Sequence, residues 1–156
     1  MSIHWYPGHM HKASNEMIET LPLVNVVVEV LDARIPYSSS NPFIGNLCTE
    51  KPCIKLLNKT DLAEPENTQL WQDHFELQSN TKTMALDLQH YDPSKKIIDL
   101  INKLSPQKEG RNTLVMVTGI PNVGKSTLIN SLAGRHIAKT GNEPAVTKGQ
   151  QRINLR

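Results

Sequence analysis

The chain has 156 residues, 38% of them apolar, and this suffices for one hydrophobic core without disulfide or metal support. Its 17 basic and 15 acidic residues give a formal charge of +2, which excludes the strong overall basicity of a self-sufficient nucleic-acid binder. No apolar run approaches membrane-spanning length, and residues 1–10 have neither a secretory apolar region nor an Arg-rich transit character. We therefore expect a cytoplasmic chain with no membrane partner.

The first predicted elements are a helix and a buried strand. Residues 9–22 show the three- and four-residue apolar spacing of a short amphipathic helix that ends at Pro22. Residues 24–31 are almost all apolar and rich in valine, which predicts a strand buried on both faces of a parallel sheet. Residues 32–42 are polar and punctuated by proline, so we expect a loop there, followed by one or two helical turns over 43–48.

The rest of the chain alternates predicted strands and helices, which is typical of the α/β class. Cys48 and Cys53 are expected as a loop thiol and a buried strand thiol, in keeping with a reducing compartment. The remaining predicted elements are a buried strand over 53–57, a helix over 66–79, a short strand over 81–88, a helix over 93–104, a polar linker over 105–112, a strand over 113–118, and a helix from Lys125 to about 132.

The strongest motif is the phosphate-binding loop Gly119-Ile-Pro-Asn-Val-Gly-Lys-Ser126, which lies between a predicted strand and a predicted helix. Glycines allow such a loop to curl and point successive backbone amides at a phosphate, and the helix dipole adds positive charge. Lys125 would reach the β- and γ-phosphates, and Ser126 would bind Mg²⁺ through its hydroxyl. The alternative is a merely glycine-rich turn between strand and helix.

A second motif, Asn58-Lys59-Thr60-Asp61, also follows a predicted buried strand. An ionised Asp61 can accept hydrogen bonds from both the ring N–H and the exocyclic amino group of guanine, a pairing that adenine does not offer. Asn58 would steady the loop or the base, and the stem of Lys59 would lie across the ring. Alone, this tetrapeptide also fits an ordinary Asn-Lys turn. Together with the phosphate loop it predicts guanine specificity.

The two motifs occur in the reverse of the usual order, because the guanine motif precedes the phosphate loop. A circular permutation can preserve a three-dimensional site while the termini move to another surface connection. We therefore predict a single permuted domain over 1–156. It comprises an amino-terminal segment over 1–104, a linker over 105–112 that forms the join, and a segment over 113–156 with the phosphate loop and a switch.

Five separated motifs together resemble the YlqF/RbgA family of circularly permuted ribosome-biogenesis GTPases. They are His4-Trp-Tyr-Pro-Gly-His-Met10, Asp32-Ala-Arg-Ile-Pro-Tyr-Ser-Ser-Ser-Asn-Pro42, the loop at 58–61, the phosphate loop with its helix, and Val146-Thr-Lys-Gly-Gln-Gln151. The resemblance implies a Ras-like P-loop NTPase fold with a mostly parallel sheet flanked by helices, GTP hydrolysis, and a role in maturing the large ribosomal subunit and its rRNA.

The family's functional residues transfer to matching positions of this sequence. The resemblance assigns catalytic roles to Lys125, to the switch residue Thr147, which would also bind Mg²⁺, and to His9, which would orient the attacking water in place of a glutamine. Asn122 matches an asparagine that accompanies K⁺ in potassium-stimulated GTPases. Nucleotide contacts are implied for Asn58, Lys59, Asp61, Ala85, Gly119, Pro121, Asn122, Val123, Gly124, Lys125, Ser126 and Thr127. Plain loop roles for His9, Asn122 and Thr147 remain open, as does a role for Asp32 and Arg34 in either the site or the strand end.

One departure concerns the Asp-x-x-Gly loop of GTPases, whose aspartate reaches Mg²⁺ through water. Residues 148–156 do not contain it. We therefore expect a fold that is incomplete at the carboxyl end, with slow or absent hydrolysis and a mobile or displaced segment from about Arg135 onward. Two other hypotheses stay open: a guanine-nucleotide or RNA-binding module without useful turnover, and an ATP-using P-loop kinase. The sequence leaves the oligomeric state open.

Overall fold

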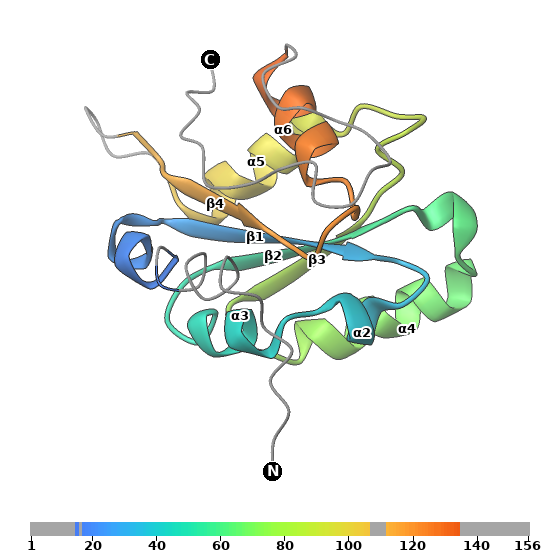
Figure 1. The fold of residues 1–156 in the computed structure, drawn as a ribbon, viewed down its shortest axis with the longest axis horizontal. Helices are drawn as coiled ribbons and strands as arrows, with labels where there is room; N and C mark the ends of the chain where they lie inside the picture. The colour runs from blue at the N-terminus through green and yellow to red at the C-terminus, as the bar shows by residue number, and fades with distance from the viewer. Residues whose placement is uncertain (1–14, 16, 107–111, 135–156) are drawn as a thin grey trace.

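Four parallel strands form a sheet in the order β3-β2-β1-β4 (Figure 1). The structure is a computed structural model that describes residues 15, 17–106 and 112–134. The strands are β1 (Val26–Asp32), β2 (Cys53–Asn58), β3 (Thr81–Ala85) and β4 (Val115–Thr118). The predicted α/β class with a parallel sheet is confirmed, and each predicted strand is present with shifted bounds.

Helices cover both faces of the sheet, as Figure 1 shows. On one face lie α5 (Ser94–Leu104) and α6 (Lys125–Ala133). On the other lie α2 (Pro36–Ser39), α3 (Pro42–Leu47) and α4 (Pro65–Glu76). Residues 17–20 are also helical, and two short 3₁₀ helices are present, η1 (Leu21–Leu23) and η2 (Thr60–Leu62). None of the described helices is both long enough and apolar enough to cross a membrane.

The central strand β1 is buried along its whole length, as its valine-rich sequence predicts. Alternate side chains of β1 pack against the helices on the two faces of the sheet, because successive residues of a strand point to opposite faces. Val26, Val28 and Val30 join the core beneath α5 and α6. Val27 packs into a smaller cluster with residues of α3, and Leu31 packs into a third cluster with Phe75 of α4. The sheet is thereby fixed between two helical layers.

Two charged side chains, Glu29 and Lys55, are buried on the α3 and α4 side of the sheet. They are register partners on β1 and β2, and the Lys55 ammonium donates to the Glu29 carboxylate. Glu29 also accepts from the Asn41 backbone N–H at 2.8 Å, and Lys55 lies 5.0 Å from the centre of the Phe75 ring. The pair is thus surrounded by partners, which buried charges require.

The segment 32–42 differs from its prediction as a loop, because it contains the four-residue helix α2. Pro36 at the first helical position is pre-set for helical φ and has no N–H to leave unpaired. The Ser39 hydroxyl then donates to Ile35 O at 2.9 Å and accepts from the Asp32 backbone N–H at 3.0 Å. These bonds fold the segment back onto the end of β1.

Other predictions near the ends of the described ranges have mixed outcomes. Residues 17–20 are helical, but the helix gives way to η1 one residue before Pro22, and residues 9–14 lie outside the described residues. Cys48 lies in the turn that follows α3, as predicted for a loop thiol, but its side chain is buried, and Cys53 is buried in β2 as expected. Most of the predicted linker, and everything after 134, also lies outside the described residues.

Candidate nucleotide-binding site

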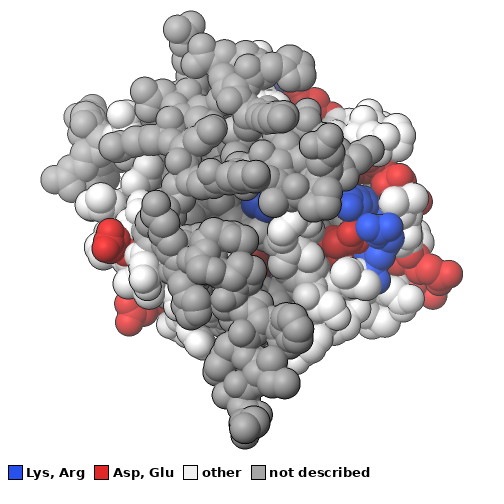
Figure 2. All heavy atoms as spheres, in the orientation of Figure 1, with Lys and Arg blue, Asp and Glu red and all other residues white. Residues whose placement is uncertain are grey.

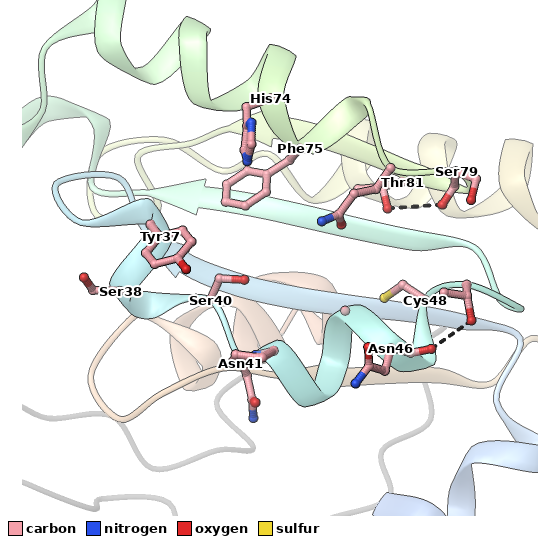
Figure 3. Close-up of a pocket in the computed structure, with 14 residues that line it drawn as sticks. Tyr37, Ser38, Ser40, Asn41, Asn46, Cys48, His74, Phe75, Ser79 and Thr81 are labelled. Carbon is pink, nitrogen blue, oxygen red and sulfur yellow. Dashed lines mark hydrogen bonds between the residues drawn. The ribbon is translucent and has the colours of Figure 1, made fainter.

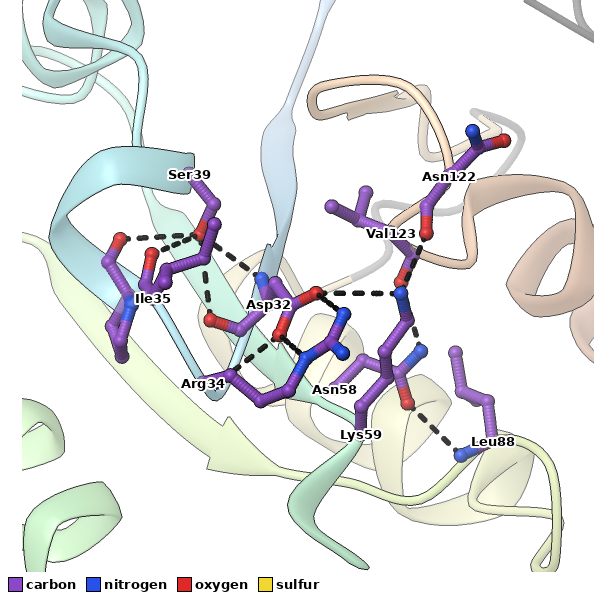
Figure 4. A network of polar contacts seen from close by, with 10 residues as sticks. Asp32, Arg34, Ile35, Ser39, Asn58, Lys59, Leu88, Asn122 and Val123 are labelled. Carbon is purple, nitrogen blue, oxygen red and sulfur yellow. Dashed lines mark hydrogen bonds and ion pairs between the residues drawn. The ribbon is translucent and has the colours of Figure 1, made fainter. Parts of the chain in front are cut away.

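The candidate site lies where the four strands end. Parallel strands place their carboxyl ends at one edge of the sheet, and ligands of open α/β folds bind outside that edge. Asp32, Asn58 and Ala85 end β1, β2 and β3, and the phosphate loop follows β4. Figure 4 shows that the side chains of Asn58 and Lys59 reach the loop that carries Asn122 and Val123, and that the Asp32 carboxylate lies beside the Lys59 ammonium. The sequence motifs therefore meet in space.

Two glycines of the phosphate loop occupy positions that a side chain would disturb. Gly119 has φ +152°, and a Cβ there would lie 2.5 Å from the Val30 carbonyl oxygen. Gly124 has φ +110°, and a Cβ there would collide with the Asn58 amide nitrogen. Positive φ and close approach both favour glycine. The loop can therefore pass close to β1 and β2, which brings its backbone to the sheet edge.

Lys125 closes the phosphate loop on itself. Its ammonium donates to the Gly119 carbonyl at 2.9 Å and to the Ile120 carbonyl at 2.6 Å. Burial lowers the pKa of Lys125, since desolvation disfavours the charged form. Lys125 begins α6, and Ser126 and Thr127 follow in its first turn. A cation, the backbone amides at the start of a helix and a hydroxyl oxygen thus occur together, a donor set that suits a phosphate with Mg²⁺.

The middle of the loop combines an exposed turn with a buried anchor. Asn122 has the left-handed φ of +61°, which asparagine tolerates better than most residues. Its side-chain amide points away from Lys59, while its carbonyl oxygen faces the lysine (Figure 4). Val123 is buried in the main core, and Pro121 is exposed. Val123 therefore anchors the loop in the core directly before Gly124 and Lys125.

Asn58 links two loops of the site to the end of β2. Its side-chain nitrogen donates to the Val123 carbonyl at 2.8 Å, and its side-chain oxygen accepts from the Leu88 backbone N–H at 3.0 Å. The residue is 5% exposed, so both bonds are made away from bulk water. These bonds fit the first of the two roles considered for Asn58 from the sequence, steadying the loop, and a contact with the base stays a prediction.

Lys59 has a left-handed backbone, with φ +67°, and a tethered side chain. Its ammonium donates to the Asn122 carbonyl at 2.8 Å and to the Asp32 carboxylate at 3.3 Å. The long stem therefore runs between the loop at 58–61 and the phosphate loop. A stem held in this way can cover an aromatic base, since the lysine side chain is apolar along its length.

Asp61 lies in η2 with its side chain exposed, next to groups that the sequence did not indicate. Ligand atoms of Asp61, Asp87 and His90 all lie within 4.8 Å of one another. Leu86, just after Ala85, accepts from the Thr60 backbone N–H at 3.1 Å, which joins the end of β3 to this loop. The sequence could not indicate Asp87 or His90, because their proximity depends on the register of β3 beside β2.

Charges of both signs surround the site. On the face shown in Figure 2, blue Lys and Arg atoms lie directly beside red Asp and Glu atoms toward the side where the strands end in Figure 1. Arg34 pairs with Asp32 at 2.7 Å, and Asp61 adds a further favourable charge near Arg34. His9 and Thr147 lie outside the described residues, so their predicted roles stay predictions.

A separate pocket of about 650 Å³ lies between α3 and α4, next to the buried Glu29–Lys55 pair (Figure 3). Its walls include Ser40, Asn41 and Phe75, the residues that contact this pair. The pocket contains none of the phosphate-loop residues. The candidate nucleotide site is therefore defined by the loops at the strand ends and not by this cavity.

The parallel sheet, the flanking helices and the glycine loop before α6 define a P-loop GTPase domain. A model of the family described as "50S ribosome-binding GTPase" matches residues 114–156. Ribosome biogenesis GTPase A of Priestia megaterium is 44% identical over 99% of this chain and 57% of its own length, and that of Thermotoga maritima is 39% identical over 97% and 53%.

A mouse protein named mitochondrial ribosome-associated GTPase 1 is 36% identical over 92% of the chain and 48% of its own length. A solved structure described as GDP-bound TM YlqF superposes with a TM-score of 0.57 at 35% identity, covering 76% of this chain and 48% of that one. The chain belongs to the YlqF/RbgA family of ribosome biogenesis GTPases. It spans just over half the length of the bacterial relatives it matches.

Proposed function

We propose that this chain binds GDP and GTP at the ends of its strands and serves as the guanine-nucleotide domain of a GTPase. The observation that carries this proposal is the direct connection between the two motifs. Asn58 and Lys59 each donate to a backbone carbonyl of the phosphate loop, at 2.8 Å in both cases. A loop that selects the base is thus held at a fixed distance from a loop that binds phosphate.

In this proposal each part of the site has a separate task. The backbone amides of the phosphate loop and the start of α6 bind the phosphates, and Lys125 adds positive charge. Asp61 accepts from the two donors on the guanine edge, and adenine would leave its carboxylate without them. The stem of Lys59 covers the ring. Ala85, at the exposed end of β3, belongs to the wall on the base side.

For the whole protein we propose GTP hydrolysis with Mg²⁺. Ser126 supplies one hydroxyl ligand, and Mg²⁺ bound there would neutralise charge on the β- and γ-phosphates. By family resemblance, Thr147 would complete the metal site, His9 would orient the attacking water, and the Asn122 amide would face K⁺. The Asn122 side chain is exposed, and its amide points away from Lys59.

We further propose that the partner is the large ribosomal subunit. The support is the printed names of the relatives, which describe ribosome biogenesis or ribosome association. Assembly of ribosomal subunits would place the protein in the cytoplasm.

The test is a titration of the purified chain with fluorescent GDP, followed by competition with GDP, GTP and ATP in the presence and absence of Mg²⁺. We expect GDP and GTP to displace the probe and ATP to fail, and Asp61→Ala to abolish this preference. Equal competition by ATP would contradict the guanine assignment. An absence of all nucleotide binding would contradict the proposal for this chain.

A further inference from the structure

The carboxylate of Asp32 contacts two cations at the nucleotide-facing edge of the sheet. Its Oδ2 accepts from the Arg34 guanidinium at 2.7 Å and from the Lys59 ammonium at 3.3 Å, and its Oδ1 accepts from Arg34 Nε at 3.0 Å (Figure 4). The Asp32 side chain is 6% exposed, whereas that of Arg34 is 48% exposed. The anion is therefore at the centre of the network, and Arg34 covers it from the solvent side.

We propose that Asp32 is a positioning residue for guanine-nucleotide binding, which it supports by holding the ammonium of Lys59 against the phosphate loop. This inference rests on the proposed nucleotide site and adds a residue to it. Within the described part of the chain, the Asp32 carboxylate hydrogen-bonds to Arg34 and Lys59 and not to Asp61 or the phosphate loop. It acts through Lys59, whose ammonium also donates to the Asn122 carbonyl at 2.8 Å.

The geometry of Asp32 is fixed from three directions. Its backbone N–H donates to the Ser39 hydroxyl at 3.0 Å, and its carboxylate accepts from the Arg34 backbone N–H at 3.0 Å. The guanidinium fork then holds both carboxylate oxygens. Such a two-pronged pairing sets orientation as well as charge. Oδ2 is consequently held where the Lys59 ammonium can reach it.

Lys59 requires such an anchor for two reasons. A non-glycine residue in the left-handed region is strained and persists when its surroundings hold it. A lysine side chain also has many rotamers, and their loss must be offset when the stem is to cover a base. Two acceptors, one on β1 and one on the phosphate loop, define one position for the ammonium. The stem between them then presents a preorganised apolar surface to the ring.

A double-mutant cycle tests this inference on the full 156-residue chain. Asp32→Asn removes the charge, Lys59→Met removes the ammonium but keeps an unbranched stem, and the double variant removes both. We expect Asp32→Asn to weaken GDP binding by about five- to tenfold, as for loss of a charged hydrogen bond. The double variant should bind GDP no more weakly than Lys59→Met alone, because Asp32 acts through the missing ammonium. Additive losses would overturn the inference.

A second readout separates positioning from general damage to the site. Inosine diphosphate lacks the exocyclic amino group that Asp61 reads, so Asp61→Ala should reduce the preference for GDP over inosine diphosphate. Asp32→Asn should weaken both nucleotides by the same factor, because the Lys59 stem covers the ring in either case. An altered preference in Asp32→Asn would overturn the inference, since it would show that the loop carrying Asp61 had moved.

The controls distinguish this inference from the proposed function itself. Asp99→Asn replaces an exposed carboxylate on α5 and should leave GDP affinity unchanged. If Asp32→Asn does not fold, Asp32→Glu takes its place in the cycle, because it retains a charge for Arg34 but moves the carboxylate from the position that holds Lys59, and the same non-additive losses are expected. Failure of the unmutated chain to bind GDP would refute the proposed function. GDP binding with additive losses would refute only the role of Asp32.

Discussion

Replacement of Asn58 by alanine should strongly destabilise the fold, because one buried side chain satisfies two backbone groups. The change removes the bond to the Val123 carbonyl at 2.8 Å and the bond from the Leu88 N–H at 3.0 Å. A buried polar group left without a partner costs roughly 1–3 kcal/mol. The two orphaned groups together should cost about 2–6 kcal/mol, a large part of the roughly 5–15 kcal/mol that stabilises a typical domain.

Urea unfolding monitored by circular dichroism measures this loss. With a slope of about 1–3 kcal/mol per molar urea, the midpoint of Asn58→Ala should fall by at least about 0.7 M. Asn58→Asp should be destabilised at least as much, because a carboxylate oxygen would face the Val123 carbonyl in place of an N–H donor. Asn46→Ala, at an exposed position of α3, is the matched control and should stay within about 0.5 kcal/mol of the parent. An Asn58→Ala midpoint equal to that of this control would refute the reasoning.

Three further predictions follow from the same structure. Glu29→Gln should lower the free energy of unfolding by about 3–5 kcal/mol, because it leaves the buried Lys55 ammonium without its anion. Adding Lys55→Met should recover part of that loss. An unchanged urea midpoint for Glu29→Gln alone would contradict the pairing. Gly124→Ala should reduce the affinity for fluorescent GDP by at least about tenfold, because residue 124 has a positive φ and the new Cβ would collide with the Asn58 amide. An affinity equal to that of the unmutated chain would contradict this prediction. The Arg34 guanidinium lowers the pKa of Asp32 from 3.8 to about 2, against the opposing effect of burial. The stabilisation from this shift is therefore present above about pH 4 and is lost as the pH falls toward 2. This stabilisation amounts to no more than about 2 kcal/mol, because Arg34 is half exposed. Asp32→Asn should lack this part of the acid sensitivity. Identical acid-unfolding curves for Asp32→Asn and the unmutated chain would contradict the role of the Arg34 pairing.

The sequence predicted the elements whose patterns are long or strongly apolar. β1 and β2 are valine- or leucine-rich runs that fit only strands buried on both faces, and α5 has isoleucines at helical spacing. The short helix α2 escaped prediction because four residues with proline and serines resemble a turn. Its formation depends on a bond between Ser39 and the distant Asp32 backbone, and local propensity does not encode such a contact.

The residues of the candidate site were likewise predictable only in part. The sequence indicated Asn58, Lys59 and the phosphate loop because each belongs to a short contiguous motif. The contacts of Asp32 with Lys59, and of Glu29 with Lys55, depend on which strands are neighbours and in what register. Spacing along a single chain does not fix either property. A charged residue inside an apolar strand signals that a partner exists, but only the sheet identifies that partner.

The central claim is that Asp61 reads guanine at a site held against the phosphate loop, and an exchange of base specificity tests it most directly. Xanthine carries a carbonyl oxygen where guanine carries its exocyclic amino group, so it calls for a donor in place of an acceptor. Dissociation constants for GDP and xanthosine diphosphate should be measured for the parent chain and for Asp61→Asn. We predict that the parent prefers GDP and that the variant prefers xanthosine diphosphate. An unchanged preference for GDP in Asp61→Asn would contradict the account, because some other residue would then read the base.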